Sequence, residues 1–309
     1  MRASNPLAPN LDARAAAIGG MGLALFAAML WGTTGTAQSL APNVLSSYWV
    51  GALRLIVASI FFAAVIAARS SGRPATRALA GLSWPRVLLA GACIAAYNLA
   101  FFAGVRASSI AIGTAVAIGS GPIWAGLLQT LLTGRLPALA WWVGAAVAVA
   151  GVGMLALSGM GDLNASPLGI ALCLGAGLSY AGYVLVNKRL VTDAAPSVAT
   201  AAVFTTAALL ATPAAWALAG PVSISGAGAA VVLYLGVVAT GVSYLLFGRA
   251  LRHISGATGV TLALAEPITA FGLAIVLVGE RPQPAALAGL ALVLAGLIAV
   301  VRAELRSHL

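Results

Sequence analysis

Two charged residues, Glu266 and Arg54, fall in the interior of long apolar runs of this sequence. A charge at the centre of a membrane-length run costs roughly 2.5–3.5 kcal/mol to insert, so charges there are expected to have a role. Glu266 could contact a positively charged group of a bound solute or carry a proton, with Arg54 as its ion-pair partner. The alternatives are a pair with a purely structural role, or an Arg54 side chain that reaches outward to water.

Several polar or aromatic side chains near the middle of other apolar runs are candidates for the wall of the same site. They are Trp31, Tyr97, Asn98, Trp124, Tyr180, Tyr183, Ser243 and Tyr244. Tyr97 and Asn98 match Ser243 and Tyr244 at an offset of 146 residues, so the two pairs share one symmetric level. For each aromatic residue the alternative is ordinary packing. One acid among aromatic rings suits a partly apolar solute that bears an amine, such as an amino acid or a lipophilic cation, whereas phosphate esters require several buried basic groups.

The elements that must position these residues are membrane-spanning helices. The chain of 309 residues is 61% hydrophobic and 7% charged, with a mean hydropathy of +1.05, which is too apolar for the surface of a soluble globule. A helical span needs about 20 apolar residues. The sequence predicts an all-α membrane protein with ten spans, at residues 19–38, 46–68, 86–105, 109–132, 138–158, 167–187, 197–219, 227–248, 255–278 and 284–302.

The basic residues predict how these spans are oriented. If both termini are cytoplasmic, thirteen of the 16 Lys and Arg residues lie in or beside cytoplasmic segments, and only Arg106 and Arg281 lie outside. The basic residues that give the net charge of +10 then set the orientation by their positions, and binding of nucleic acid is not expected. At ~1.5 Å per residue, Arg54 lies ~12 Å and Glu266 ~14 Å below the outer edge of the membrane.

The chain contains two copies of one unit. Gly121-Pro122 matches Glu266-Pro267 at an offset of 145 residues, and only the second copy kept the carboxylate. Because each copy has five spans, an odd number, the second must be inverted. The predicted units are a cytoplasmic tail at 1–18, a first five-helix repeat at 19–160, a second, inverted repeat at 161–303 and a cytoplasmic tail at 304–309. Inverted repeats are typical of secondary transporters, whose solute site lies near the membrane midplane.

Pro122 and Pro267 lie near the middle of the fourth and ninth spans. Each proline frees a carbonyl one turn earlier and permits a bend. The two prolines are predicted either as paired hinges for alternating access or as fixed kinks.

Glycines of the fifth and tenth spans repeat at a spacing of seven residues. Gly144 and Gly151 in the fifth span match Gly289 and Gly296 in the tenth. Small residues on one face let helices approach closely, which predicts packing between helices or a dimer contact.

The sequence contains no clear set of catalytic residues. No glycine-rich loop ends in Lys-Ser or Lys-Thr, and the six acids do not cluster. Cys93 and Cys173 lie in separate predicted spans and show no metal-binding spacing. No cofactor and no metal are therefore expected.

The ordered set of Trp31-Gly32, Arg54, Pro122 and Glu266-Pro267, one in each of four spans, resembles the EamA family of the drug/metabolite transporter superfamily. The resemblance covers residues 20 to 301. It implies a ten-helix exporter in a bacterial inner membrane, with helices 1–4 and 6–9 around a central cavity and helices 5 and 10 outside it. Within the family, the sequence is most similar in general appearance to YddG-type exporters of aromatic and neutral amino acids.

The expected function is export of small metabolites, amino acids first, by alternating access. The alternatives are an exporter of drugs and other organic cations, a membrane enzyme, or a scaffold that transports nothing. The expected partners are a small-molecule substrate and the lipid bilayer, with proton coupling left open, and the chain is expected as a monomer or a weak homodimer.

Overall fold

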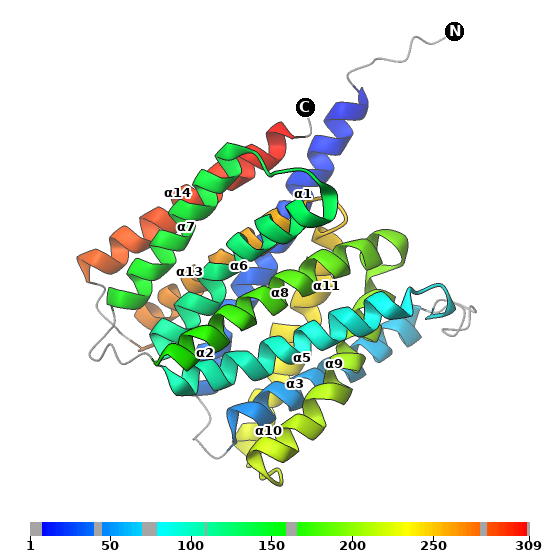
Figure 1. Ribbon diagram of the computed structural model, residues 1–309. Coiled ribbons are helices and arrows are strands. Elements are labelled where there is room, and N and C mark those ends of the chain that lie inside the picture. Colours follow the sequence, from blue (N-terminus) through cyan, green and yellow to red (C-terminus); the bar gives the residue numbers. More distant parts are fainter. Residues whose placement is uncertain are drawn as a thin grey trace.

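The computed structural model describes residues 8–39, 45–69, 79–108, 110–158, 166–278 and 283–307 (Figure 1). In these ranges every regular element is helical, and ten helices are long and apolar enough to cross a membrane. The prediction of an all-α chain with ten spans is confirmed.

The first repeat is made of α1 and the helices that follow it up to α7. Their bounds are α1 Ala8–Gly32, α2 Thr34–Ser39, α3 Ser47–Arg69, α5 Trp84–Ala107, α6 Ile110–Thr133 and α7 Leu139–Ser158. α1 and α2 together form the first span.

The second repeat contains two spans that are not regular α-helices throughout. Its elements are α8 Pro167–Asp193, α9 Pro196–Ala219, α10 Gly226–Tyr234, a π-helical segment Leu235–Val242, α11 Ser243–Ala250, α12 Gly256–Leu262, a 3₁₀ turn Ala263–Ala265, α13 Glu266–Leu273, a π-helical segment Ala274–Val278 and α14 Pro284–Arg306. Segments α10 to α11 form one span, and α12 to residue 277 form the next.

Helix starts follow local sequence signals. α5, α8, α9 and α14 each carry a proline in the first turn, where the missing N–H has no intrahelical partner to lose. Ser166, Ser225 and Ser255 precede α8, α10 and α12, and each side chain accepts a hydrogen bond from the backbone N–H three residues later. α1 and α14 extend beyond the predicted apolar runs, to Ala8 and Arg306, because helical hydrogen bonding does not stop where the hydropathy falls.

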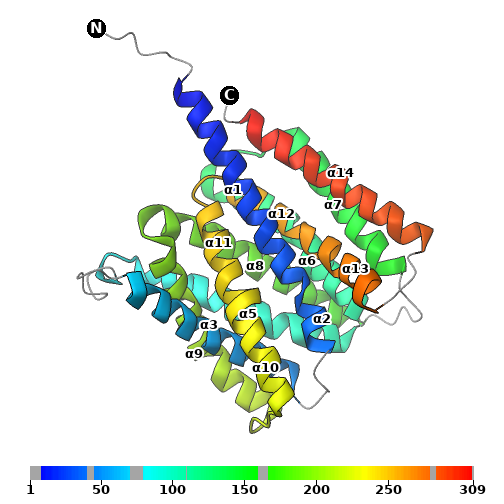
Figure 2. The same cartoon turned by 180° about the vertical axis from the view of Figure 1, so that it is seen from behind.

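The contacts between helices occur in pairs that the repeat relates. α1 packs against α11 and α13, and its counterpart α8 packs against α5 and α6. α3 packs against the π-helical segment 235–242, as α9 packs against α5. α7 and α14 contact α6 and α12 respectively, and also contact each other. The start of α1 and the end of α14 lie at the same end of the bundle, as two repeats of five spans require (Figures 1 and 2).

α7 and α14 lie side by side along one edge of the bundle (Figures 1 and 2). A Cβ atom on Gly151 would lie 2.5 Å from the backbone nitrogen of Val293 and 2.6 Å from the carbonyl oxygen of Gly289. A Cβ atom on Gly296 would likewise meet backbone atoms of Gly144 and Ala148. The glycine faces of the fifth and tenth spans therefore cover each other within one chain, which favours the packing alternative over a dimer contact.

Candidate functional site

Glu266 lies at the middle of the ninth span, where the helix changes from a 3₁₀ turn to α13. The ten residues before it, 256–265, are all buried, whereas the side chains of Glu266 and Pro267 are half-buried. Pro267 has no N–H to donate to the carbonyl of Ala263, and the N–H of Glu266 bonds that carbonyl instead. The proline thus produces the local irregularity that presents Glu266.

Pro122 occupies a different backbone setting from Pro267. α6 continues as a regular α-helix from Ile110 to Thr133 around Pro122. The ninth span, which contains Pro267, instead includes the 3₁₀ turn just before this proline and the π-helical segment Ala274–Val278 after it. The two matching prolines therefore lie in unlike geometries, and the hinge role stays a prediction.

Five of the predicted aromatic residues meet in one cluster, although they come from four helices. They are Trp31 of α1, Tyr97 of α5, Tyr180 and Tyr183 of α8, and Tyr244 of α11. Ring centroids are 5.0 Å apart for Trp31 and Tyr244, 6.3 Å for Trp31 and Tyr180, and 5.5 Å for Tyr97 and Tyr180. Tyr97, Tyr180 and Tyr244 also lie within electrostatic range of Glu266. The cluster and the carboxylate therefore form one candidate site.

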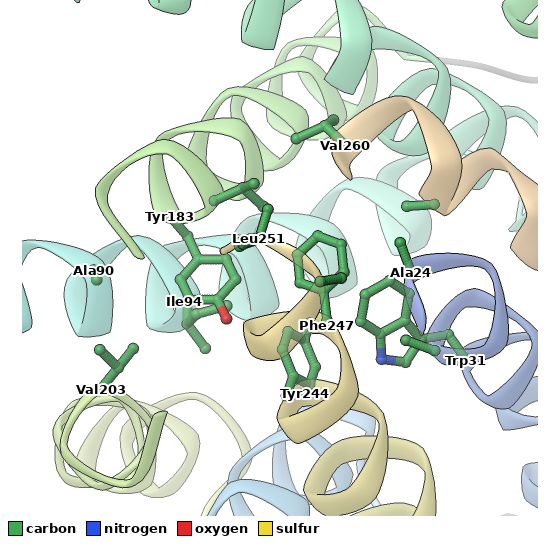
Figure 3. Close-up of a cluster of buried hydrophobic side chains, with 14 of the residues drawn as sticks. Ala24, Trp31, Ala90, Ile94, Tyr183, Val203, Tyr244, Phe247, Leu251 and Val260 are labelled. Carbon is green, nitrogen blue, oxygen red and sulfur yellow. The ribbon is translucent and has the colours of Figure 1, made fainter. Parts of the chain in front are cut away.

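Two phenylalanines of this cluster were not predicted. The ring of Phe247 is 5.2 Å from that of Trp31, and the ring of Phe204 is 4.5 Å from that of Tyr244. Figure 3 shows Trp31, Phe247 and Tyr244 together, with Tyr183 beside them. The repeat contained a signal for Phe247, which matches Phe101 at the offset of 146, and Phe101 lies against Tyr97 at 5.9 Å. Phe204 has no such signal.

Arg54 and Glu266 do not form the expected ion pair. Among the described residues the ion pair is that of Arg86 with Asp193, at 2.8 Å near the ends of α5 and α8. Arg54 interacts electrostatically with Glu266, but its Nη2 donates a hydrogen bond of 2.7 Å to Oδ1 of Asn98. α3 places Arg54 opposite Asn98 of α5, and this contact replaces the predicted one.

Unpaired donors accompany the cluster. In the part of the chain that the structure describes, Trp31 Nε1, Arg54 Nε and Tyr180 Oη are buried and make no hydrogen bond. A buried donor without a partner costs about 1–3 kcal/mol, so a polar ligand group or a water molecule beside these donors would be stabilising.

Two other predicted site residues, Ser243 and Trp124, differ from the residues of the aromatic cluster. Ser243 Oγ donates to backbone carbonyls of its own helix, Ala239 at 2.7 Å and Thr240 at 3.1 Å. Its hydroxyl is therefore satisfied by the span itself. Trp124 is half-buried and makes no ring contact with another aromatic residue in the described ranges, although its Nε1 is also unpaired.

Gly32 brings α1 directly onto the backbone that carries Glu266. A Cβ atom on Gly32 would lie 2.5 Å from the carbonyl oxygen of Glu266 and 2.6 Å from Cβ of Thr269. Gly177, 145 residues later, meets Ser120 and the carbonyl oxygen of Ala117 in the same way on α6. Close packing at Gly32 thus holds the neighbouring Trp31, a member of the aromatic cluster, near the backbone of Glu266. The corresponding contact at Gly177 recurs in the other repeat.

We expect Gly32→Ala to lower the apparent melting temperature by about 2–10 °C, because an added methyl group must displace α1 or α13 and overpacking costs about 1–3 kcal/mol. Gly35→Ala is the matched control, since a Cβ atom there meets no atom of the described residues within 4 Å. Thermal unfolding of the purified protein in detergent measures both variants. Equal melting temperatures for the two variants would contradict the close contact.

Glu304 is a buried acid that the sequence predicted only as part of a cytoplasmic tail. α14 continues through it, and its side chain is 7% exposed. Its Oε1 accepts from the backbone N–H of Ser255 at 2.6 Å, and its Oε2 accepts from Oγ of Ser255 at 3.0 Å and from Oγ1 of Thr258 at 2.6 Å. Glu304 thereby ties the tenth span to the start of the ninth. A lone acid between Arg302 and Arg306 was the available signal.

Two further side chains hold the same turn between the eighth and ninth spans. Nζ of Lys188 donates to the carbonyl of Leu251 at 2.7 Å, and Oε1 of Gln129 accepts from the N–H of Ala257 at 3.1 Å. At the opposite end of the bundle, Oη of Tyr234 bonds Oγ1 of Thr33 at 2.8 Å. The ninth span is therefore anchored at the end of the bundle that carries the termini, in addition to its contact with α1.

Comparison with known proteins gives a consistent result. Residues 18–157 and 167–302 each match the EamA-like transporter family. The chain is 37% identical over 277 residues to the "Uncharacterized transporter YwfM" of Bacillus subtilis (strain 168), a match that covers 89% of this chain and 91% of that protein. A crystal structure with 21% sequence identity has a TM-score of 0.76, covering 93% of this chain and 98% of its own, and supports the fold alone.

Proposed function

Because the chain belongs to the EamA-like transporter family, and is therefore a multi-pass transporter and not an enzyme, we propose that it exports amino acids of the aromatic and neutral kinds. The membrane concerned is the inner membrane of a bacterium, with both termini in the cytoplasm. The chain would then share with YddG-type exporters, which it resembles in sequence, both the fold and the class of solute.

The observation that carries this proposal is the half-buried carboxylate of Glu266 at the middle of its span, beside a cluster of aromatic rings. Within the described residues the carboxylate forms no ion pair that would neutralise its charge. An ammonium group of a solute suits this position, because charge-assisted hydrogen bonds are strong away from water. Aromatic faces suit an apolar or aromatic side chain and also attract cations.

Alternating access is the proposed mechanism. The two repeats would rock about the site, and the spans of the second repeat that contain π-helical segments and the 3₁₀ turn would change shape most readily. Pro122 and Pro267 are the proposed hinges, and Glu266 is the proposed carrier if a proton is coupled. Since α7 and α14 cover each other, one chain, or at most a weak homodimer, is the proposed working unit.

The test is efflux from proteoliposomes that contain the purified transporter and are preloaded with radiolabelled phenylalanine or threonine. We expect saturable efflux of phenylalanine that exceeds leakage from protein-free liposomes, and an imposed pH gradient changes the rate if protons are coupled. A third set of liposomes, loaded with tetraphenylphosphonium, tests the second candidate function, because a carboxylate near aromatic rings also suits an organic cation. Efflux of the organic cation without efflux of either amino acid would overturn the proposal.

A further inference from the structure

Arg54 carries a positive charge in the interior of a membrane span and has only a neutral group as its observed partner. Its side chain is half-buried, Nη2 bonds the amide of Asn98, and Nε is buried without a partner. Charges inside a membrane are expected to be paired or to serve transport. An anion is therefore the missing partner, and Glu266 does not supply it.

The guanidinium is held in a defined position. Asn98 is 3% exposed and donates through Nδ2 to the carbonyl of Ile94 at 2.9 Å, which leaves Oδ1 directed to Arg54. The backbone of Arg54 is fixed by the π-helical segment, since a Cβ atom on Gly236 would lie 3.2 Å from the carbonyl oxygen of Arg54 and would clash with Val57. An arginine that reached outward to water would not make these buried contacts.

Among the described residues neither of these opposite charges forms an ion pair, yet they lie near enough to interact electrostatically. Tyr97 and Tyr244 are within electrostatic range of both Arg54 and Glu266, so the aromatic cluster borders both charges. We propose that Arg54, positioned by Asn98, binds the carboxylate of the transported solute while Glu266 binds its ammonium group. The site then selects zwitterionic amino acids and excludes amines that lack a carboxylate.

This inference rests on the proposed function and sharpens it, because it separates amino acids from organic cations by one residue. A guanidinium is suited to the role, since its fork of donors matches a carboxylate. With Nη2 bound to Asn98, Nε and Nη1 remain to donate to the solute.

The test measures binding of three ligands to the purified transporter in detergent by calorimetry. They are phenylalanine, phenethylamine, which lacks the carboxylate, and 3-phenylpropionate, which lacks the amine. We expect phenylalanine to bind at least about tenfold more tightly than either of the others, because each charged contact contributes roughly a factor of 10 to 100.

Two variants and one control test whether Arg54 is the residue that binds the carboxylate of the solute. Arg54→Gln should lower the affinity for phenylalanine by about tenfold or more and change the affinity for phenethylamine by less than about threefold. Asn98→Asp should have the same selective effect, because its carboxylate pairs with Arg54 and competes with that of the solute while the arginine stays in place. Arg86→Gln, the same change at an exposed ion pair near the start of α5, should leave all three affinities as in the wild type.

The outcomes distinguish this inference from the proposed function. If phenethylamine binds the wild type as tightly as phenylalanine, or if Arg54→Gln weakens both equally, the inference is overturned while amino-acid export stands. If no amino acid binds and only organic cations do, both are overturned. Should Arg54→Gln fail to fold, Asn98→Asp decides, and unchanged binding of phenylalanine by that variant contradicts the inference.

Discussion

Glu266→Gln is expected to lower the initial rate of phenylalanine efflux by about tenfold to a hundredfold. The substitution keeps the shape of the side chain but removes the charge that is proposed to bind the ammonium group, and hydrogen bonds to charged groups contribute about 1.5–3 kcal/mol. If Glu266 also carries the coupled proton, the remaining efflux no longer responds to a pH gradient. Radiolabelled efflux from proteoliposomes, with and without the gradient, measures both effects.

The same variant should fold at least as well as the wild type. Among the described residues the carboxylate of Glu266 makes no hydrogen bond or ion pair that the amide would break, and a neutral group costs less to place inside a membrane. Asp12→Asn, at an exposed acid of α1, is the control for loss of one negative charge and should transport as the wild type does. Efflux by Glu266→Gln at the rate of the wild type would remove Glu266 from the mechanism.

Glu304→Gln should have the opposite profile, with a loss of stability as its first effect. An amide has only one acceptor oxygen, so it cannot accept all three hydrogen bonds from Ser255 and Thr258. The loss of a negative charge also weakens the interaction with the N-terminus of α12 and with Lys188. The expected destabilisation of about 1.5–3 kcal/mol corresponds to a fall of roughly 3–10 °C in melting temperature.

The comparison of the two glutamates is informative because the chemical change is identical. Thermal unfolding in detergent should rank Glu304→Gln below the wild type and Glu266→Gln at or above it. Phenylalanine binding, measured below the melting temperature of each variant, should be weakened at Glu266 and nearly unchanged at Glu304. A stable Glu304→Gln protein would mean that the hydrogen bonds to the ninth span contribute little.

Local sequence signals predicted the helices well and their ends less well. Serine caps and first-turn prolines mark the starts of several helices, as at Ser166 and Pro167. The ends of the first and last spans were underestimated, because a helix can continue beyond the apolar part of a span. Burial of Glu304 followed from that continuation, together with the turn of α14 that faces Ser255.

The composition of the candidate site was only partly predictable from the sequence. The interior acid and the mid-span aromatic residues indicated Glu266, Trp31, Tyr97 and their neighbours. Sequence reasoning could not separate Ser243, whose hydroxyl bonds its own helix, from Tyr244, which joins the aromatic cluster one residue later. Adjacent residues of a helix point about 100° apart, so the choice depends on how the helix is rotated.

The sequence by itself determined the ten spans and the inverted repeat, because membrane thickness sets the length of each apolar run and an odd number of spans in each repeat requires inversion. It also predicts that Arg54 and Glu266 lie at similar depth, since depth follows from the residue count along a span. Only the tertiary structure decided that Arg54 bonds Asn98 and that Glu266 forms no ion pair with any residue in the described ranges. The physical reason is that the direction of a side chain around the helix axis is set by packing against neighbouring helices, here through close contacts such as that of Gly32 with the backbone of Glu266.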